Sequence, residues 1–261
     1  MFSERSLAGE LATVRERHAP DALVLDCERD FETLDPAVAE ELLLVTDDVA
    51  PLSYPDEWVP DDAPAELHAF ASSDFTVGTP GDGGVAWTRQ TDPAVVLVKP
   101  RLAGSPDDFV EFLLAEALVA TGLGVPEQFL GFFEERYRAF AAATADHLSP
   151  AGTYQLAAAV FDAFVGLQTR PVFADWEGDL PALFDAWVDA GERLEPRLGD
   201  LSGEVAMGQT KFPAAAELAC SAIKHGVEVP APFAALDTSA YGEYGPEYAV
   251  TWAEKTLAEL S

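Results

Sequence analysis

The stretch of residues 75–101, FTVGTPGDGGVAWTRQTDPAVVLVKPR, most constrains the fold, because it alone has a clear β-strand pattern. Two β-prone runs, 75–77 and 85–88, flank a turn rich in glycine and proline, which predicts a hairpin. The continuous apolar run 94–98 is too short for a typical helix, and it predicts a strand buried on both faces. Together these runs predict a small antiparallel β-meander.

The chain beyond Arg101 follows a helical pattern instead. Apolar side chains recur there at the 3.6-residue period of an α-helix, and broad apolar stripes such as the one in residues 179–194 must be buried. We therefore expect an α+β protein, mostly α, in which a small α/β part (residues 1–102) precedes a helical array (residues 103–261). The two parts form either two domains or one continuous domain.

Two further elements are predicted in the N-terminal part. The apolar run 22–25 predicts a short strand. The Asp-Pro pair at residues 35–36 is typical of a helix start, and the helix would place Val38, Leu42 and Val45 on one side.

The net charge of −31 is the strongest signal in the composition, and only four of the fifteen basic residues are lysine. At low salt such carboxylates repel one another, whereas molar salt shortens the Debye length to about 3 Å. This composition is typical of a protein from a salt-filled cytosol such as that of a haloarchaeon. An acidic chain without a basic stripe is also a poor candidate for binding nucleic acid or an anionic membrane.

The sequence predicts a cytoplasmic protein with no membrane partner. Residues 1–20 carry charges and no apolar signal-peptide core, and the apolar window 109–125 is too short to span a bilayer. Cys27 and Cys220 have no disulfide-framework or zinc-ligand spacing, so we expect reduced thiols, no metal and no cofactor. Cys220 and Lys224 share a helix face, which leaves a reactive thiol as an alternative.

The glycine-rich turn and the end of the third predicted strand suit an anionic ligand. Backbone N–H groups in such turns bind anions, and nearby cations add attraction. The predicted ligand-binding residues are Gly78, Gly81, Gly83, Gly84, Lys99 and Arg101. The structural alternative is a tight hairpin with a charged strand end. No nucleophile or paired-histidine signature identifies catalytic residues.

Over residues 75–116 this arrangement resembles, in part, the glycine-rich loop and strand lysine of the protein kinase fold. The resemblance implies that Lys99 pairs with a carboxylate such as Glu111 or Glu116 on the next helix. The sequence has no HRD motif, no DFG motif and no catalytic-loop asparagine, so it lacks the residues of a phosphotransferase.

Four segments, FTVGTPGDG, AGTYQLAAAVFDAF, DAWVDAGERLEPRL and FPAAAELACSAIKH, are similar to a haloarchaeal family of uncharacterised proteins, a domain of unknown function. This resemblance covers nearly the whole chain. It supports the salt-filled cytosol and implies no particular activity.

Two functions stay open at this point. The first is a soluble, non-enzymatic regulatory or scaffolding protein whose helical part offers an apolar face to itself or to a protein partner. The second is an enzyme or a sensor that binds a phosphate-bearing small molecule at residues 78–84 and Lys99. A concave pocket where the turn and the cations converge favours the second, and a filled hairpin surface favours the first.

Overall fold

The computed structural model describes residues 2–72, 74–81 and 83–259. The chain forms two compact units, each assembled from segments that are separate in sequence. Unit 1 comprises Met1–Ser53, Ala69–Glu127 and Asp175–Ala186, and unit 2 comprises Tyr54–His68, Gln128–Ala174 and Trp187–Ser261. The predicted α+β class with mostly helical structure is confirmed. The predicted division of the chain into residues 1–102 and residues 103–261 stays a prediction.

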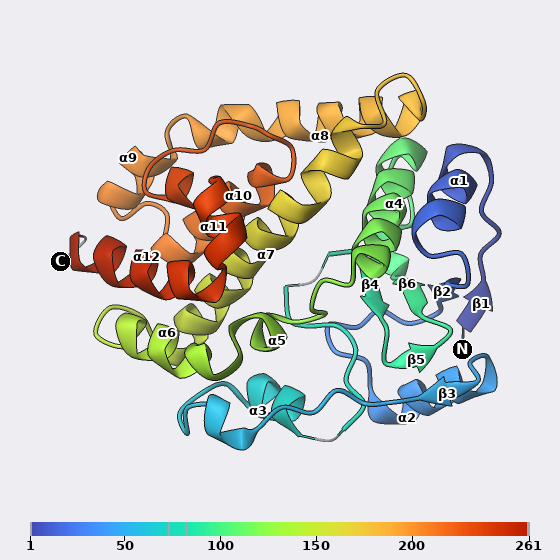
Figure 1. Cartoon of the computed structure of the whole chain (residues 1–261), viewed down its shortest axis with the longest axis horizontal. Helices are drawn as coiled ribbons and strands as arrows, with labels where there is room; N and C mark the ends of the chain where they lie inside the picture. Colours follow the sequence, from blue (N-terminus) through green and yellow to red (C-terminus); the bar gives the residue numbers. More distant parts are fainter. Residues whose placement is uncertain (1, 73, 82, 260–261) are drawn as a thin grey trace. The chain divides into compact units, whose positions relative to one another are not determined.

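Unit 1 contains all the strands (Figure 1) among the residues that the structure describes. Its elements in chain order are β1 (Phe2–Glu4), α1 (Gly9–His18), β2 (Leu23–Cys27), α2 (Pro36–Ala39), the 3₁₀ helix η1 (Glu40–Leu44), β3 (Asp48–Val49), β4 (Val85–Thr88), β5 (Thr91–Asp92), β6 (Val95–Val98), η3 (Pro100–Leu102) and α4 (Asp107–Leu123). Two helices, α3 (Ala65–Ala71) and α8 (Pro181–Leu198), have residues in both units.

A four-stranded sheet with the order β1-β2-β6-β4 organises unit 1. Strand β6 pairs in parallel with β2, where Leu25 lies opposite Leu97, and antiparallel with β4, where Ala86 lies opposite Leu97. The predicted strand at 22–25 is confirmed as β2. The two later strands of the predicted meander are confirmed as β4 and β6.

The first strand of the predicted meander is wrong, because residues 75–77 do not form a strand. In the predicted meander these residues would pair with β4, but β4 lies at the end of the sheet, and its neighbour β6 pairs with β2 on the side away from β4. Val77 instead lies in an irregular segment, where its carbonyl oxygen accepts a hydrogen bond from the Leu34 N–H at 2.9 Å and its side chain is buried. The β-prone composition of this run therefore reflects burial, which favours the same residue types as strand pairing does.

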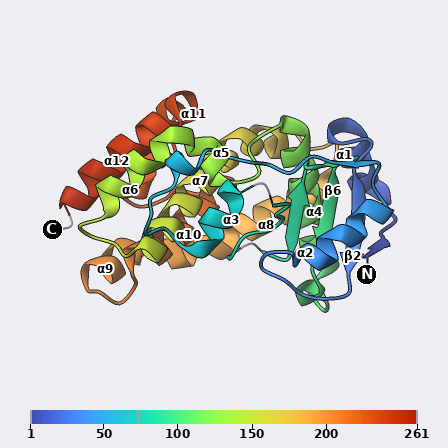
Figure 2. The same cartoon turned by 90° about the horizontal axis from the view of Figure 1, so that it is seen from below.

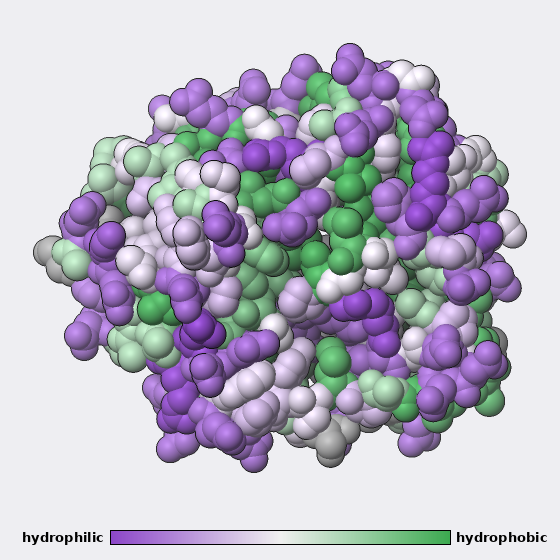
Figure 3. Space-filling model, viewed as in Figure 1, coloured by the Kyte–Doolittle hydropathy of each residue, from purple (hydrophilic) through white to green (hydrophobic). Residues whose placement is uncertain are grey.

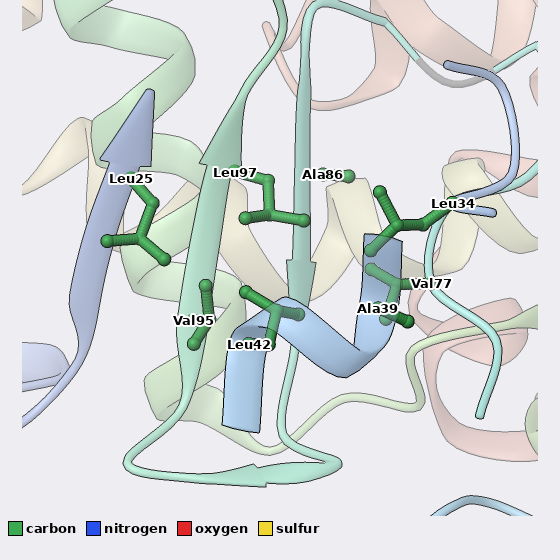
Figure 4. Close-up of a cluster of buried hydrophobic side chains, with 8 residues drawn as sticks. All are labelled: Leu25, Leu34, Ala39, Leu42, Val77, Ala86, Val95 and Leu97. Atoms are coloured by element: carbon green, nitrogen blue, oxygen red, sulfur yellow. The ribbon is translucent and has the colours of Figure 1, made fainter. Parts of the chain in front are cut away.

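One face of the sheet packs against Leu34, Ala39, Leu42 and Val77, which lie outside the strands (Figure 4). Val95 and Leu97 of β6, Leu25 of β2 and Ala86 of β4 meet Leu42 of η1 in this core. Successive side chains of a strand point to opposite faces, so only alternate residues of β6 take part.

The other face of the sheet is covered by α4, which packs against β4 and β6 and has α1 beside it. Val96 and Val98 lie on this face and are buried. The predicted strand buried on both faces is therefore confirmed for β6. Helix α4 approaches α1 closely at Gly122, where an added Cβ atom would lie 2.1 Å from the carbonyl oxygen of His18.

The helix predicted to start at residues 35–36 changes its form after one turn. Helix α2 gives way to η1, which ends at Leu44, so Val45 lies outside the helix with a φ of −125° and helical spacing no longer places it. Leu42 is completely buried, but Val45 is 43% exposed. The predicted shared side is therefore wrong for Val45.

Unit 2 is helical. Its elements in chain order are η2 (Asp56–Trp58), α5 (Phe129–Phe133), η4 (Glu134–Arg136), α6 (Tyr137–Thr144), α7 (Pro150–Ala174), α9 (Leu201–Ala206), α10 (Phe212–Ile223), η5 (Phe233–Leu236), α11 (Ser239–Tyr244) and α12 (Pro246–Glu259), together with the parts of α3 and α8 named above. Helix α10 runs beside α7 (Figures 1 and 2). The two approach closely at Gly166, where a Cβ atom would lie 3.0 Å from the backbone nitrogen of Lys224.

Helix α7 is the one helix, among residues with a described position, that is long and apolar enough to cross a membrane by length and composition. Half of its apolar window is buried inside the protein, and the core helix of a soluble protein passes the same test. The feature is weak evidence for a membrane span.

Aromatic side chains form the core of unit 2. The Phe132 ring lies 5.6 Å from Phe161, 4.7 Å from Phe164 and 6.4 Å from Tyr241, measured between ring centroids. The Tyr241 hydroxyl donates a hydrogen bond to the Val160 carbonyl at 2.7 Å. The aromatic stripes of the sequence are thus buried within the unit itself.

Candidate functional site

Lys99 lies directly after β6, next to the glycine-rich turn. Its N–H donates a hydrogen bond to the Gly84 carbonyl at 2.8 Å, and Gly84 is buried, with a side-chain carbon of Leu102 only 2.2 Å from where its Cβ atom would be. The Lys99 side chain is 1% exposed, and its Nζ atom lies 4.7 Å from the centroid of the Phe31 ring. Lys99 is therefore a buried cation on an aromatic face.

Arg101 is exposed but bound to two carboxylates of unit 1. Its Nε atom lies 2.8 Å from Asp30 Oδ1, and its Nη2 atom lies 2.8 Å from Glu32 Oε1 and donates to the Phe31 carbonyl at 3.0 Å. The hydrogen bonds from Arg101 lower the pKa of Asp30 and of Glu32, and the two carboxylates raise the pKa of Arg101. The positive charge of Arg101 is thus matched within its own unit.

The turn glycines differ in their surroundings. The Gly81 N–H donates to Glu32 Oε2 at 3.4 Å, so it shares a carboxylate with the arginine. Gly83 is exposed, and Gly78 is half-buried with a φ of 79°. Asp82 lies outside the described residues. The structure therefore brings two of the six predicted residues to one carboxylate of the chain itself, while Gly84 and Lys99 meet through their backbones.

The resemblance to the protein kinase loop stays a prediction, and two features that it implies are missing from the described residues. The predicted hairpin lacks its first strand, and Glu111, one of the two carboxylates that the resemblance pairs with Lys99, is exposed. Within the described part of the chain, no ion pair joins Glu111 to Lys99.

Sequence analysis missed an apolar segment that faces solvent. Leu43, Leu44 and Val45 are 54%, 84% and 43% exposed. We call residues 43–45 the exposed apolar segment. Single exposed apolar side chains are common, but contiguous ones mark interaction sites or ligand grooves.

Both ends of the exposed apolar segment are fixed. Leu42, directly before it, is completely buried and accepts a hydrogen bond from the Thr46 hydroxyl at 2.8 Å. The Asp47 N–H donates to the Asp92 carbonyl at 2.6 Å, and β3 then pairs with β5. A segment held in this way loses little conformational entropy when it binds a partner.

Acidic residues surround the exposed apolar segment in sequence. Glu40, Asp47 and Asp48 are exposed and Glu41 is half-buried. The sequence has no lysine or arginine between residues 30 and 88. The segment therefore presents apolar side chains in a strongly negative setting.

A polar network at the β4–β5 connection was also missed. The carboxylate of Glu127 accepts hydrogen bonds from the Thr88 hydroxyl at 2.9 Å, from Gln90 Nε2 at 3.0 Å and from the Arg89 N–H. Burial raises the pKa of Glu127, while these three hydrogen bonds oppose the rise. All its partners are donors from one connection, which fits a structural role.

Neither cysteine is placed as a reactive thiol. Burial raises the pKa of Cys27 to about 11 and raises the pKa of the completely buried Cys220 well above its usual value. Both are free cysteines. The part of the chain with described positions contains no group of three or more His, Cys, Asp or Glu side chains that could hold a metal ion.

The chain is thus an acidic α+β protein of two units, mostly helical. In unit 1, the chain's own Glu32 carboxylate contacts two of the residues that were predicted to bind an anionic ligand. The chain matches the model of a family of unknown function, DUF7089, over residues 1–260, and it belongs to that family. The predicted membership of a family of unknown function is thus confirmed. No curated protein and no solved structure matched the chain.

Proposed function

We propose that this protein is a soluble, cytoplasmic, non-enzymatic regulatory or scaffolding protein that binds a protein partner through the exposed apolar segment, residues 43–45. The observation that carries the proposal is the 84% exposure of Leu44 between two fixed ends. Exposing three consecutive apolar side chains in a rigid segment has a cost in free energy that burial against a partner would recover.

The charge of the chain supports an apolar mode of binding. A net charge of −31 fits a salt-filled cytosol, and hydrophilic residues cover most of the face shown in Figure 3. In molar salt, attraction between exposed charges is screened beyond about 3 Å, whereas apolar burial is not. A protein in such a solvent therefore needs apolar contacts for affinity, and charge then selects the partner.

The acidic setting indicates the chemistry of that partner. Like charges placed against one another disfavour a complex, so the partner surface should carry few carboxylates. We expect an apolar groove bordered by arginine or lysine side chains, which would face Glu40, Asp47 and Asp48.

The contacts of the predicted anion site support a structural role there. Lys99 is buried, and the guanidinium of Arg101 and the Gly81 N–H both meet Glu32. An anionic ligand would have to displace that carboxylate.

Site-specific photo-crosslinking tests the proposal. Leu44 is replaced by p-benzoylphenylalanine in the native host, and a second strain carries the same group at Met207, which is 67% exposed in unit 2. The expected result is a crosslink to one discrete protein from position 44 and none to that protein from position 207. Equal crosslinking from both positions, or crosslinking only between copies of this chain, would contradict the proposal.

A phosphate-bearing small molecule at the turn stays a second candidate, and one observation favours it. A guanidinium and a backbone N–H already converge on one anionic group, the Glu32 carboxylate. Replacing Glu32 by Gln should then increase the thermal stabilisation by inorganic phosphate or by nucleoside monophosphates. If neither the wild type nor Glu32→Gln responds to these compounds, the second candidate is wrong.

A further inference from the structure

A cavity of about 320 Å³ lies in unit 2, apart from the features described above. Its size falls within the range of small-molecule sites, about 300–1,000 Å³. One wall consists of Pro60, Asp62 and Ala63, the opposite wall is α6, and the remainder comes from the chain that leads into α7. All of its lining residues belong to one unit.

The side chains of α6 that line the cavity are mostly small, and they leave space beside the helix. Arg138, Ala141, Ala142 and Ala145 line the cavity at the i, i+3, i+4, i+7 spacing, which places them on one helix face. Three methyl groups leave space that longer side chains would fill. The result is an apolar surface suited to an apolar ligand body.

Arg138 keeps the opposite wall in place. Its Nη1 atom donates hydrogen bonds to the carbonyl oxygens of Glu57 at 2.8 Å and of Val59 at 3.3 Å. These bonds fix the chain just before Pro60. The guanidinium is thus already engaged with the backbone of unit 2.

Tyr137 lines the cavity and supplies a hydroxyl without a partner. Its side chain is 1% exposed, and its ring packs 5.4 Å from Phe129 and 6.0 Å from Phe133 between centroids. The hydroxyl makes no hydrogen bond to any residue that the structure describes. Burial and the negative charge of Asp62, which lines the same cavity, raise the pKa of Tyr137, so its hydroxyl is neutral.

Asp62 contributes an exposed carboxylate to the lining of the same cavity. It forms no hydrogen bond or ion pair with any described residue. The guanidinium of Arg138 also lines the cavity, but it is directed at the carbonyl oxygens of Glu57 and Val59, so the Asp62 carboxylate and the net charge of −31 favour a cation over an anion. A carboxylate and a phenol oxygen both accept hydrogen bonds from an ammonium group.

We propose that this cavity binds a small organic cation, whose apolar body lies against the alanine face of α6 and whose ammonium group binds the Asp62 carboxylate and the Tyr137 hydroxyl. The site is separate from the exposed apolar segment, so it does not depend on the proposed protein partner.

Isothermal titration calorimetry in about 1 M KCl tests the site with three probes of one shape, since an ammonium group in direct contact with the exposed Asp62 carboxylate lies within the Debye length of about 3 Å. The probes are 2-phenylethylamine, the neutral 2-phenylethanol and the anionic 3-phenylpropionate. We expect the amine to bind at least about tenfold more tightly than the other two. Equal affinity for the alcohol or the carboxylate would overturn the choice of a cation.

Variants with matched controls locate the binding. Asp62→Asn should weaken amine binding at least about fivefold, while Asp61→Asn, at the neighbouring carboxylate that does not line the cavity, should leave it within about twofold. Tyr137→Phe keeps the packed ring and should weaken binding about threefold, while Tyr244→Phe at an exposed tyrosine should not. Equal effects of a variant and its control would contradict the assignment.

A cavity-filling variant tests whether the amine binds inside this cavity. Ala142 is exposed at the mouth of the cavity, so Ala142→Trp should fold normally and abolish amine binding. Unchanged affinity in Ala142→Trp would place the binding elsewhere. Absence of heat for 2-phenylethylamine, tryptamine and cyclohexylamine up to about 10 mM with the wild type would overturn the site itself.

Discussion

The Nζ atom of Lys99 lies 4.7 Å from the centroid of the Phe31 ring. Asp30 and Glu32, on either side of Phe31 in sequence, are both held by Arg101. The aromatic ring is therefore fastened over the lysine from both sides. This arrangement gives the lysine at the end of β6 a role in folding.

Replacing Lys99 by Ala should destabilise unit 1. A side chain that is 1% exposed leaves a cavity when it is truncated, and comparable changes in protein cores cost about 2–5 kcal/mol. Lys255→Ala, at an exposed position, should change the free energy of unfolding by less than about 0.5 kcal/mol. Urea unfolding in molar KCl measures both. A Lys99→Ala protein as stable as the control would argue for a ligand-binding lysine instead.

The contact between α1 and α4 predicts opposite effects of two glycine substitutions. Gly122→Ala should cost about 1–3 kcal/mol or more, because its Cβ atom would lie 2.1 Å from the backbone oxygen of His18. Gly203→Ala in α9, with no atom within 4 Å, should stabilise the protein by up to about 1 kcal/mol. Thermal melts of the two variants would contradict the close packing if both were equally stable.

The buried carboxylate of Glu127 predicts a pH-dependent difference in stability. Because burial raises the pKa of Glu127 above its value in the unfolded chain, its favourable contribution is complete below the unfolded pKa of about 4.3 and declines as pH rises through the folded pKa. The free energy of unfolding of the wild type minus that of Glu127→Gln should therefore fall between about pH 4 and pH 7. A difference that is constant or rises over this range would contradict the assignment.

Repulsion among carboxylates predicts a strong dependence of stability on salt. With a net charge of −31, the melting temperature should rise by about 10 °C or more from low salt to molar KCl, which corresponds to roughly 3 kcal/mol for a protein of this size. Far-ultraviolet circular dichroism measures this transition, since it follows the helices of both units. A flat response would remove the halophilic interpretation.

Local patterns in the sequence predicted those strands whose residue types alone indicate their burial. The run of Val95–Val98 is a strand buried on both faces because four apolar β-branched or aliphatic residues in succession suit a position between two layers. Residues 75–77, Phe-Thr-Val, are also of types enriched in strands but form no ladder, since β-propensity does not distinguish a strand from a buried irregular segment.

The candidate sites depended on contacts that periodicity does not encode. Gly81 and Glu32 are separated by 49 residues, so no local pattern predicts that a carboxylate meets the glycine-rich turn. The exposure of Val45 follows from the end of η1 at Leu44, which the spacing of apolar residues does not indicate. Sequence analysis did not identify the cavity in unit 2, because the space beside the alanine face of α6 depends on residues 60–63, which are distant in sequence.

Binding of the partner that is crosslinked from position 44 tests the proposed function most directly. Calorimetry in molar KCl compares the wild type with Leu44→Ser and with Met207→Ser, since both substitutions are at exposed side chains and should change stability by less than about 0.5 kcal/mol. We predict that Leu44→Ser weakens the affinity at least about tenfold, while Met207→Ser leaves it within about twofold. Affinity unchanged in Leu44→Ser would contradict the account.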